Sequence, residues 1–75
     1  MNKTSLKKIA RQKVNELTAN MSNDEMRALL VENTHYSRGL IDTALGNATA
    51  EQLRNEIACL LSLWDIRRLM GEIAA

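Results

Sequence analysis

The chain has 75 residues, of which 45% are apolar and 25% charged, with one cysteine, no proline and a formal net charge of +1. A single cysteine excludes a disulfide within a monomer, and no stretch approaches the roughly 18 consecutive apolar residues of a membrane-spanning helix. The basic N-terminus lacks the apolar segment of a signal peptide. We therefore expect a single all-helical domain over residues 1–75, located in the cytoplasm and not attached to a membrane.

Three short helices are predicted in the first two thirds of the chain. Apolar residues recur every three or four positions at the start and predict a helix over about 5–20. Residues 22–25 have the spacing of a capping box, which begins a second helix over 23–33. An apolar stripe predicts the third helix over 38–45, and Gly46-Asn47 is expected to stop it in the left-handed conformation.

A fourth, long helix is predicted over 50–73. A second capping box, at 49–52, starts it, and no helix breaker follows until Gly71. It is apolar nearly all round over 57–66, so it should be buried on more than one side. The three short helices offer only narrow apolar stripes, and a chain of this length buries only about 60% of the surface that its unfolded form exposes.

These features predict an all-α bundle of three short helices and one long C-terminal helix, which forms an isologous homodimer through the long helix. The residues expected at this interface are Ile57, Leu60, Leu61, Leu63, Trp64 and Met70.

Charge is distributed unevenly along the chain. The first 13 residues carry five basic and no acidic side chains, whereas the remainder carries five arginines against nine acids. Lys7, Lys8 and Arg11 lie away from the apolar face of the first predicted helix, and positive charge near a helix N-terminus is unfavourable. They are candidates for contact with an acidic protein surface or with phosphates. The alternative is a solvated helix face that keeps the protein soluble.

The polar segment between the second and third helices supplies the other candidate contacts, His35, Tyr36 and Arg38. The alternative is a simple connector with the Tyr36 ring at the edge of the core. A helix-turn-helix fits this region poorly, because Arg38 is the one basic residue on the would-be recognition helix and Asp42 is placed to pair with it.

No arrangement typical of catalysis or metal binding occurs in the sequence. His35 has no second histidine or cysteine nearby, and Cys59 is expected to be a buried, inert thiol. There is no glycine-rich phosphate loop and no nucleophile elbow. We therefore expect no enzymatic activity, no metal and no cofactor.

The sequence thus favours a non-enzymatic module that binds a partner protein and acts as a small adaptor, inhibitor or regulator. Accessory proteins of phages and bacteria often have this size and composition. The alternative is a dimeric nucleic-acid-binding regulator that uses the basic first helix, whose affinity would fall steeply with salt.

Overall fold

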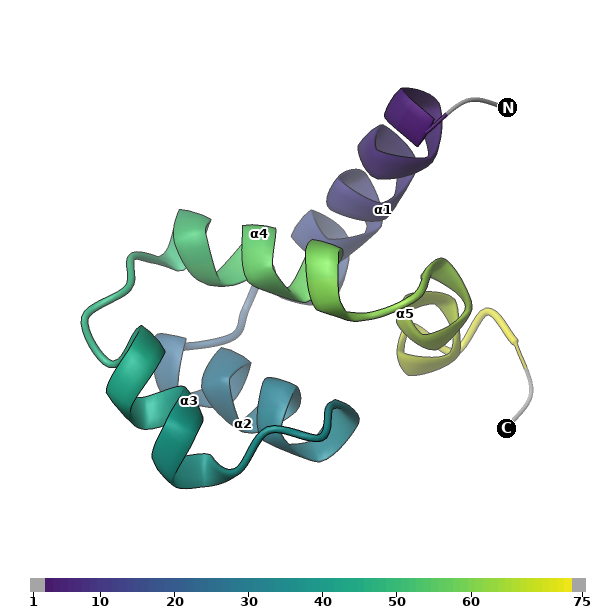
Figure 1. Cartoon of the computed structure of the whole chain (residues 1–75). Helices are drawn as coiled ribbons and strands as arrows, with labels where there is room; N and C mark the ends of the chain where they lie inside the picture. Colours follow the sequence, from purple (N-terminus) through teal and green to yellow (C-terminus); the bar gives the residue numbers. More distant parts are fainter. Residues whose placement is uncertain (1–2, 74–75) are drawn as a thin grey trace.

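Five helices form the part of the chain that the computed structural model describes, residues 3–73, with side chains from residue 5 onward. No strand occurs in this part, so the predicted all-α class is confirmed. In chain order the helices are α1 (Lys3–Leu17), α2 (Asn23–Asn33), α3 (Arg38–Leu45), α4 (Ala50–Leu60) and α5 (Leu63–Leu69) (Figure 1).

Both predicted capping boxes are present. The Ser22 hydroxyl accepts from the Glu25 backbone N–H at 3.1 Å, and the Glu25 carboxylate accepts from the Ser22 N–H at 3.0 Å. Thr49 and Gln52 make the same reciprocal pair at the start of α4, at 3.1 and 2.9 Å. Each box satisfies backbone donors that a helix N-terminus leaves unpaired, which is why α2 and α4 begin where the sequence indicates.

The prediction of one long C-terminal helix over 50–73 is wrong. The chain leaves helical geometry at Leu61, which has the extended values φ −97° and ψ 143°. Ser62 then caps α5, because its hydroxyl accepts from the Asp65 N–H at 3.1 Å. A straight helix over 50–73 would carry apolar residues on all its sides, and they could not all face one core. The break at Leu61 turns both Leu61 and Ile66 toward the core.

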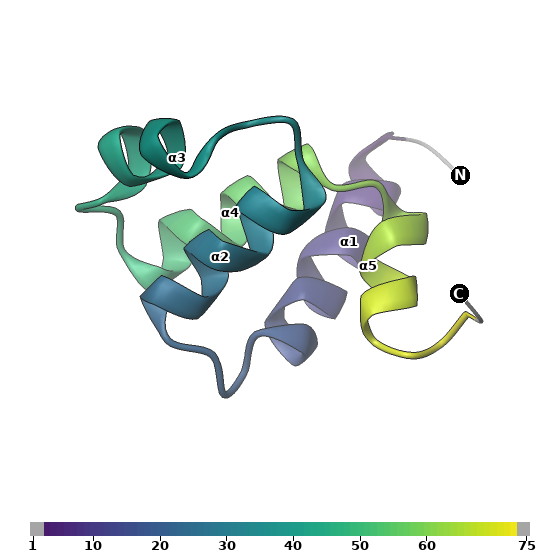
Figure 2. The ribbon, with the colours of Figure 1, turned by 90° about the horizontal axis from the view of Figure 1, so that it is seen from below.

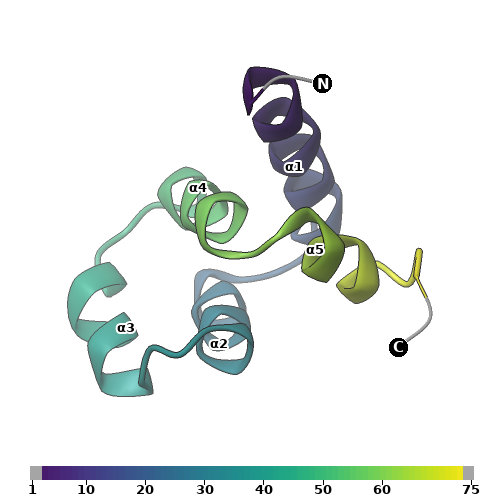
Figure 3. The same ribbon diagram turned by 45° about the vertical axis from the view of Figure 1, so that its right-hand side comes forward.

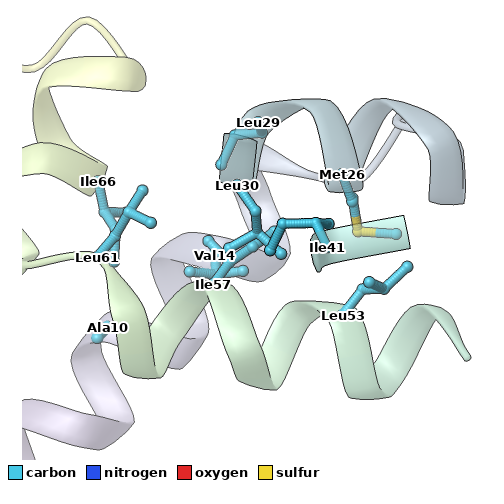
Figure 4. Packing of buried hydrophobic residues seen from close by; sticks show 10 residues of the cluster. All are labelled: Ala10, Val14, Met26, Leu29, Leu30, Ile41, Leu53, Ile57, Leu61 and Ile66. Atoms are coloured by element: carbon cyan, nitrogen blue, oxygen red, sulfur yellow. The ribbon is translucent and has the colours of Figure 1, made fainter. Parts of the chain in front are cut away.

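The core takes residues from every helix and from the α4–α5 junction (Figure 4). Ile57 of α4 lies at its centre beside Val14 and Leu30, while Leu61 and Ile66 lie together toward the α5 side. Burial of such side chains is the main stabilising contribution in a small domain. The buried apolar residues are Ala10, Val14, Met26, Leu29, Leu30, Ile41, Leu53, Ile57, Leu61 and Ile66.

The helices pack unevenly around this core. α4 packs against both α1 and α2, and α5 packs against α1 (Figure 2). α3 packs on α2 and stands apart from α4 along most of its length (Figure 3). This placement leaves the surfaces of α3 and α4 that face each other only partly covered.

Gly46 ends α3 in a different way from the one predicted. Its φ and ψ are −61° and −30°, in the right-handed region, and no residue other than glycine within residues 3–73 has a positive φ. The left-handed stop expected at Gly46-Asn47 is therefore wrong. Glycine is required here for a steric reason, since a Cβ atom at residue 46 would overlap the carbonyl oxygen of Asp42.

We expect Gly46→Ala to lower the free energy of unfolding by about 1–3 kcal/mol, because the added Cβ forces the backbone to shift at the exposed end of α3. Gly39 is the matched control, because a Cβ there would meet nothing within 4 Å. Gly39→Ala should raise stability by about 0.4–1 kcal/mol, since alanine loses less backbone entropy on folding. Urea denaturation of both variants measures the difference. If the two substitutions changed the free energy of unfolding by the same amount in the same direction, the steric account would be contradicted.

Candidate functional site

An apolar hollow lies between α3 and α4, and we call it the α3–α4 trough. Leu40 is 49% exposed, Tyr36 45% and Leu60 39%, although all three side chains are large and carry apolar surface. Exposed apolar residues gathered in one hollow are typical of an interaction site rather than of an ordinary surface. The residues that line it are Tyr36, Leu40, Ile41, Ala44, Leu45, Glu56 and Leu60.

The trough continues along α4 in both directions. One adjoining hollow shares Ala44, Leu45 and Glu56 with it and extends to Gln52. On α4, residues 52, 56 and 60 follow each other at intervals of four, so they lie on one face and span about 12 Å at 1.5 Å per residue. A second hollow shares Tyr36 and Leu60 with the trough and extends it toward α5. The whole depression has the length of two to three turns of a helix.

Two acidic side chains of the trough have no cationic partner in the described part of the chain. Glu56, on its α4 wall, and Glu32, at its α2 end, form no ion pair with any described side chain. By contrast, Asp65 at the same end pairs with Arg68 at 3.3 Å. The free charge of the trough is therefore negative.

The six predicted contact residues fall into two separate groups. His35 and Tyr36 line the end of the trough, and Arg38 stands beside them at the start of α3. Arg38 is paired with Asp42 at 3.2 Å, the pair expected from the sequence. The other three predicted contact residues, Lys7, Lys8 and Arg11, lie on α1, which is set apart from α3 (Figures 1 and 3).

The basic face of α1 is largely neutralised within the chain. Arg11 joins α1 to α4, since it pairs with Glu51 and its Nε donates to Asn55 Oδ1 at 2.8 Å. Lys13 donates to both carboxylate oxygens of Glu72 at 2.9 Å, and this bond is the main reason that the pKa of Glu72 is lowered. Lys7 and Lys8 are exposed and pair with no acidic side chain of the described chain. Among the described side chains, they are the free positive charges of this face.

The six residues predicted for a dimer interface differ in how deeply they are buried. Ile57 and Leu61 lie in the core of the single chain, and Leu63 and Met70 are half-buried against that core. Leu60 and Trp64 are exposed, Trp64 by 61%. Leu60 belongs to the trough, and Trp64 lies on the first turn of α5.

Within residues 3–73, every helix is too short or too polar to span a lipid bilayer. In the same range, no three histidine, cysteine, aspartate or glutamate side chains come together as a metal site. Comparisons with protein-family models, with curated proteins and with solved structures found no match to this chain. The trough is therefore the feature of this chain that points to a function.

Of the residues that line the trough, the sequence analysis named Tyr36 as a contact residue and Leu60 as a dimer-interface residue, but it did not single out Leu40, Ala44 or Glu56. The available signal was the stripe of four apolar residues on the short α3, of which only Ile41 is buried. Cys59 was expected to be buried, and this prediction is wrong, because its side chain is exposed on the α1 side of α4. Although residues 57–66 are apolar on nearly all sides, not every side of this segment is buried.

Proposed function

We propose that this chain is a non-enzymatic interaction module that binds a helix of a partner protein in the α3–α4 trough, and so serves as a small adaptor, inhibitor or regulator. The observation that carries the proposal is the grouping of Tyr36, Leu40 and Leu60, each more than a third exposed, in one apolar hollow. Covering this surface contributes to binding at about 25 cal/mol per Å² of apolar area removed from water.

The shape of the trough favours a helix as the bound element. Helices that bind in grooves present apolar residues at intervals of three and four, and the trough offers matching contacts over two to three turns. One wall of the trough is the face of α4 that carries Gln52, Glu56 and Leu60. An extended peptide would need an open strand edge for its backbone hydrogen bonds, and the described residues contain no strand.

The charge of the trough indicates the chemistry of the partner helix. Glu32 and Glu56 at its edges have no cationic partner among the described side chains, so lysine or arginine next to the apolar anchors of a bound helix would gain from both carboxylates. Complementary charge of this kind favours correct encounter and orientation more than raw affinity. The expected partner is therefore an amphipathic helix with a basic edge.

A nucleic-acid-binding function through α1 has narrower support, namely Lys7 and Lys8, which are exposed and pair with no acid within the described part of the chain. Arg11 and Lys13 are engaged with Glu51 and Glu72, so they are not free to neutralise phosphates. Contacts from these two described lysines alone would give a shallow dependence of affinity on salt, whereas proteins with six to ten phosphate contacts show a steep one.

The test is retention from a nuclease-treated lysate of the source organism on the immobilised full chain, compared among three forms. Leu40→Asp places a charge in the trough, and the new carboxylate suits the first turn of α3, so the fold should persist. Gln12→Asp places the same charge on the exposed side of α1 as a matched control. We expect the unaltered chain and the control to retain one partner protein in stoichiometric amount. With Leu40→Asp, the amount of this protein that is retained should fall about tenfold or more.

Two results would contradict the proposal. Equal retention by all three forms would mean that the trough is not the binding surface. In a parallel lysate without nuclease, retention of nucleic acid alone, abolished by Lys7→Glu with Lys8→Glu and weakened by salt, would give the function to α1 instead.

A further inference from the structure

We infer that the helix which occupies the α3–α4 trough when the chain is alone is the N-terminal half of α1 from a second copy of the same chain. The inference rests on the proposed function, because it names a partner for the same trough. A helix of a different protein would then compete with α1 for this surface.

The apolar stripe of α1 extends beyond the core of its own chain. Leu6, Ala10 and Val14 follow each other at intervals of four and therefore lie on one face of the helix. Ala10 and Val14 are buried, whereas Leu6 is 44% exposed. The first turns of α1 project past α4 in Figures 1 and 3. This end of α1 thus presents an apolar anchor that its own chain leaves partly uncovered.

The charges beside this anchor complement those of the trough. Lys7 and Lys8 directly follow Leu6 and have no acidic partner among the described residues. Glu32 and Glu56 at the trough have no basic partner in the same part of the chain. Docking of α1 into the trough would pair two free cations with two free anions, and would cover Leu6 together with Leu40 and Leu60.

The contact must form between two chains. The face of α4 that carries Glu51, Asn55 and Ala58 looks toward α1, as the bonds of Arg11 to Glu51 and Asn55 show. The trough lies on the other face of α4, which carries residues 52, 56 and 60. Because α1 is fixed on one side of α4, its Leu6 cannot reach the trough on the other side of the same chain.

A symmetric contact of one trough with another is less favourable. It would cover the same apolar residues, but it would bring Glu56 of each copy toward the acidic edge of the other, and like charges across an interface are repulsive. The long-helix dimer expected from the sequence is not formed by this fold either, since Ile57 and Leu61 are already in the core.

The test is a charge exchange, followed by sedimentation equilibrium of the full-length chain. One variant carries Lys7→Glu with Lys8→Glu, and the other carries Glu32→Lys with Glu56→Lys. In each variant alone, α1 and the trough bear the same charge, so the dissociation constant for self-association should rise about tenfold or more. An equimolar mixture restores opposite charges at both contacts and should associate as tightly as the unaltered chain. Added salt should weaken the association of the unaltered chain.

Two further variants separate a lost contact from a lost fold. Leu6→Asp leaves the trough intact and should abolish association while circular dichroism stays helical. Asn20→Asp, with the same added charge in the exposed turn that follows α1, should associate normally.

The inference is overturned by an unaltered chain that stays monomeric at every concentration, or by two charge variants that fail to associate when mixed although both are folded. In either case a protein captured by the unaltered chain but not by Leu40→Asp would leave the proposed function standing. Failure of both experiments would remove the trough as a binding surface altogether.

Discussion

Replacing Ile57 with alanine is expected to lower the free energy of unfolding by about 2–5 kcal/mol. Ile57 is completely buried at the centre of the core, beside Val14 of α1 and Leu30 of α2 (Figure 4). Its removal would leave a cavity at the point where three helices meet. Since domains are stable by only about 5–15 kcal/mol, this single change should consume a large part of the total. Urea denaturation monitored by circular dichroism measures it.

Leu60→Ala is the matched control, because Leu60 lies three residues further along the same helix. Its side chain is 39% exposed, so truncation should cost about 1 kcal/mol or less. Both variants are compared at low protein concentration, so that self-association does not contribute. Equal losses at the two positions would mean that α4 does not turn Ile57 inward and Leu60 outward.

The second large effect is expected for Thr18→Val, which should lower the free energy of unfolding by about 1–3 kcal/mol. Thr18 is the one fully buried polar side chain of the described chain, just after the end of α1. Its hydroxyl donates to the Val14 carbonyl at 2.7 Å and accepts from Arg54 Nε at 3.0 Å. Valine has the same shape but no acceptor, so the half-buried Arg54 would lose a hydrogen-bond partner.

A double-mutant cycle separates this bond from simple packing. Arg54→Met removes the donor that Thr18→Val leaves unpaired, so the two changes together should cost less than the sum of the single changes. Thr18→Ser keeps the hydroxyl and serves as the conservative variant. Strictly additive costs from chemical denaturation would show that the Arg54–Thr18 bond contributes no net stability.

Features that depend on neighbouring residues could be predicted from the sequence. The starts of α2 and α4 follow from side chains that bond to backbone groups three residues away, and the Arg38–Asp42 pair follows from helix periodicity. The break at Leu61 follows from the same kind of signal, Ser62 with Asp65. It was missed because it lies within an apolar run that favours a continuous helix.

The trough could not be predicted in this way, because it depends on contacts between distant segments. Leu40 and Ala44 belong to an apolar stripe that would face a core if α3 packed along α4. α3 instead packs on α2, and this placement is what leaves Leu40 facing Leu60 across an open hollow. The uneven distribution of charge is visible in the sequence, but the division of the α1 cations into paired and free ones is not. It depends on Glu51, which pairs with Arg11 from 40 residues away, and on Glu72, which pairs with Lys13 from 59 residues away.

The most direct test of the trough as the recognition surface is an amide NMR series of the ¹⁵N-labelled full chain over increasing protein concentration. We predict progressive shifts at residues 5–9 of α1 and on the facing sides of α3 and α4, centred on Leu40 and Leu60, with little change at the C-terminal end of α5. Shifts centred on Trp64 and Met70, with α3 unaffected, would contradict this account and place the interface on α5.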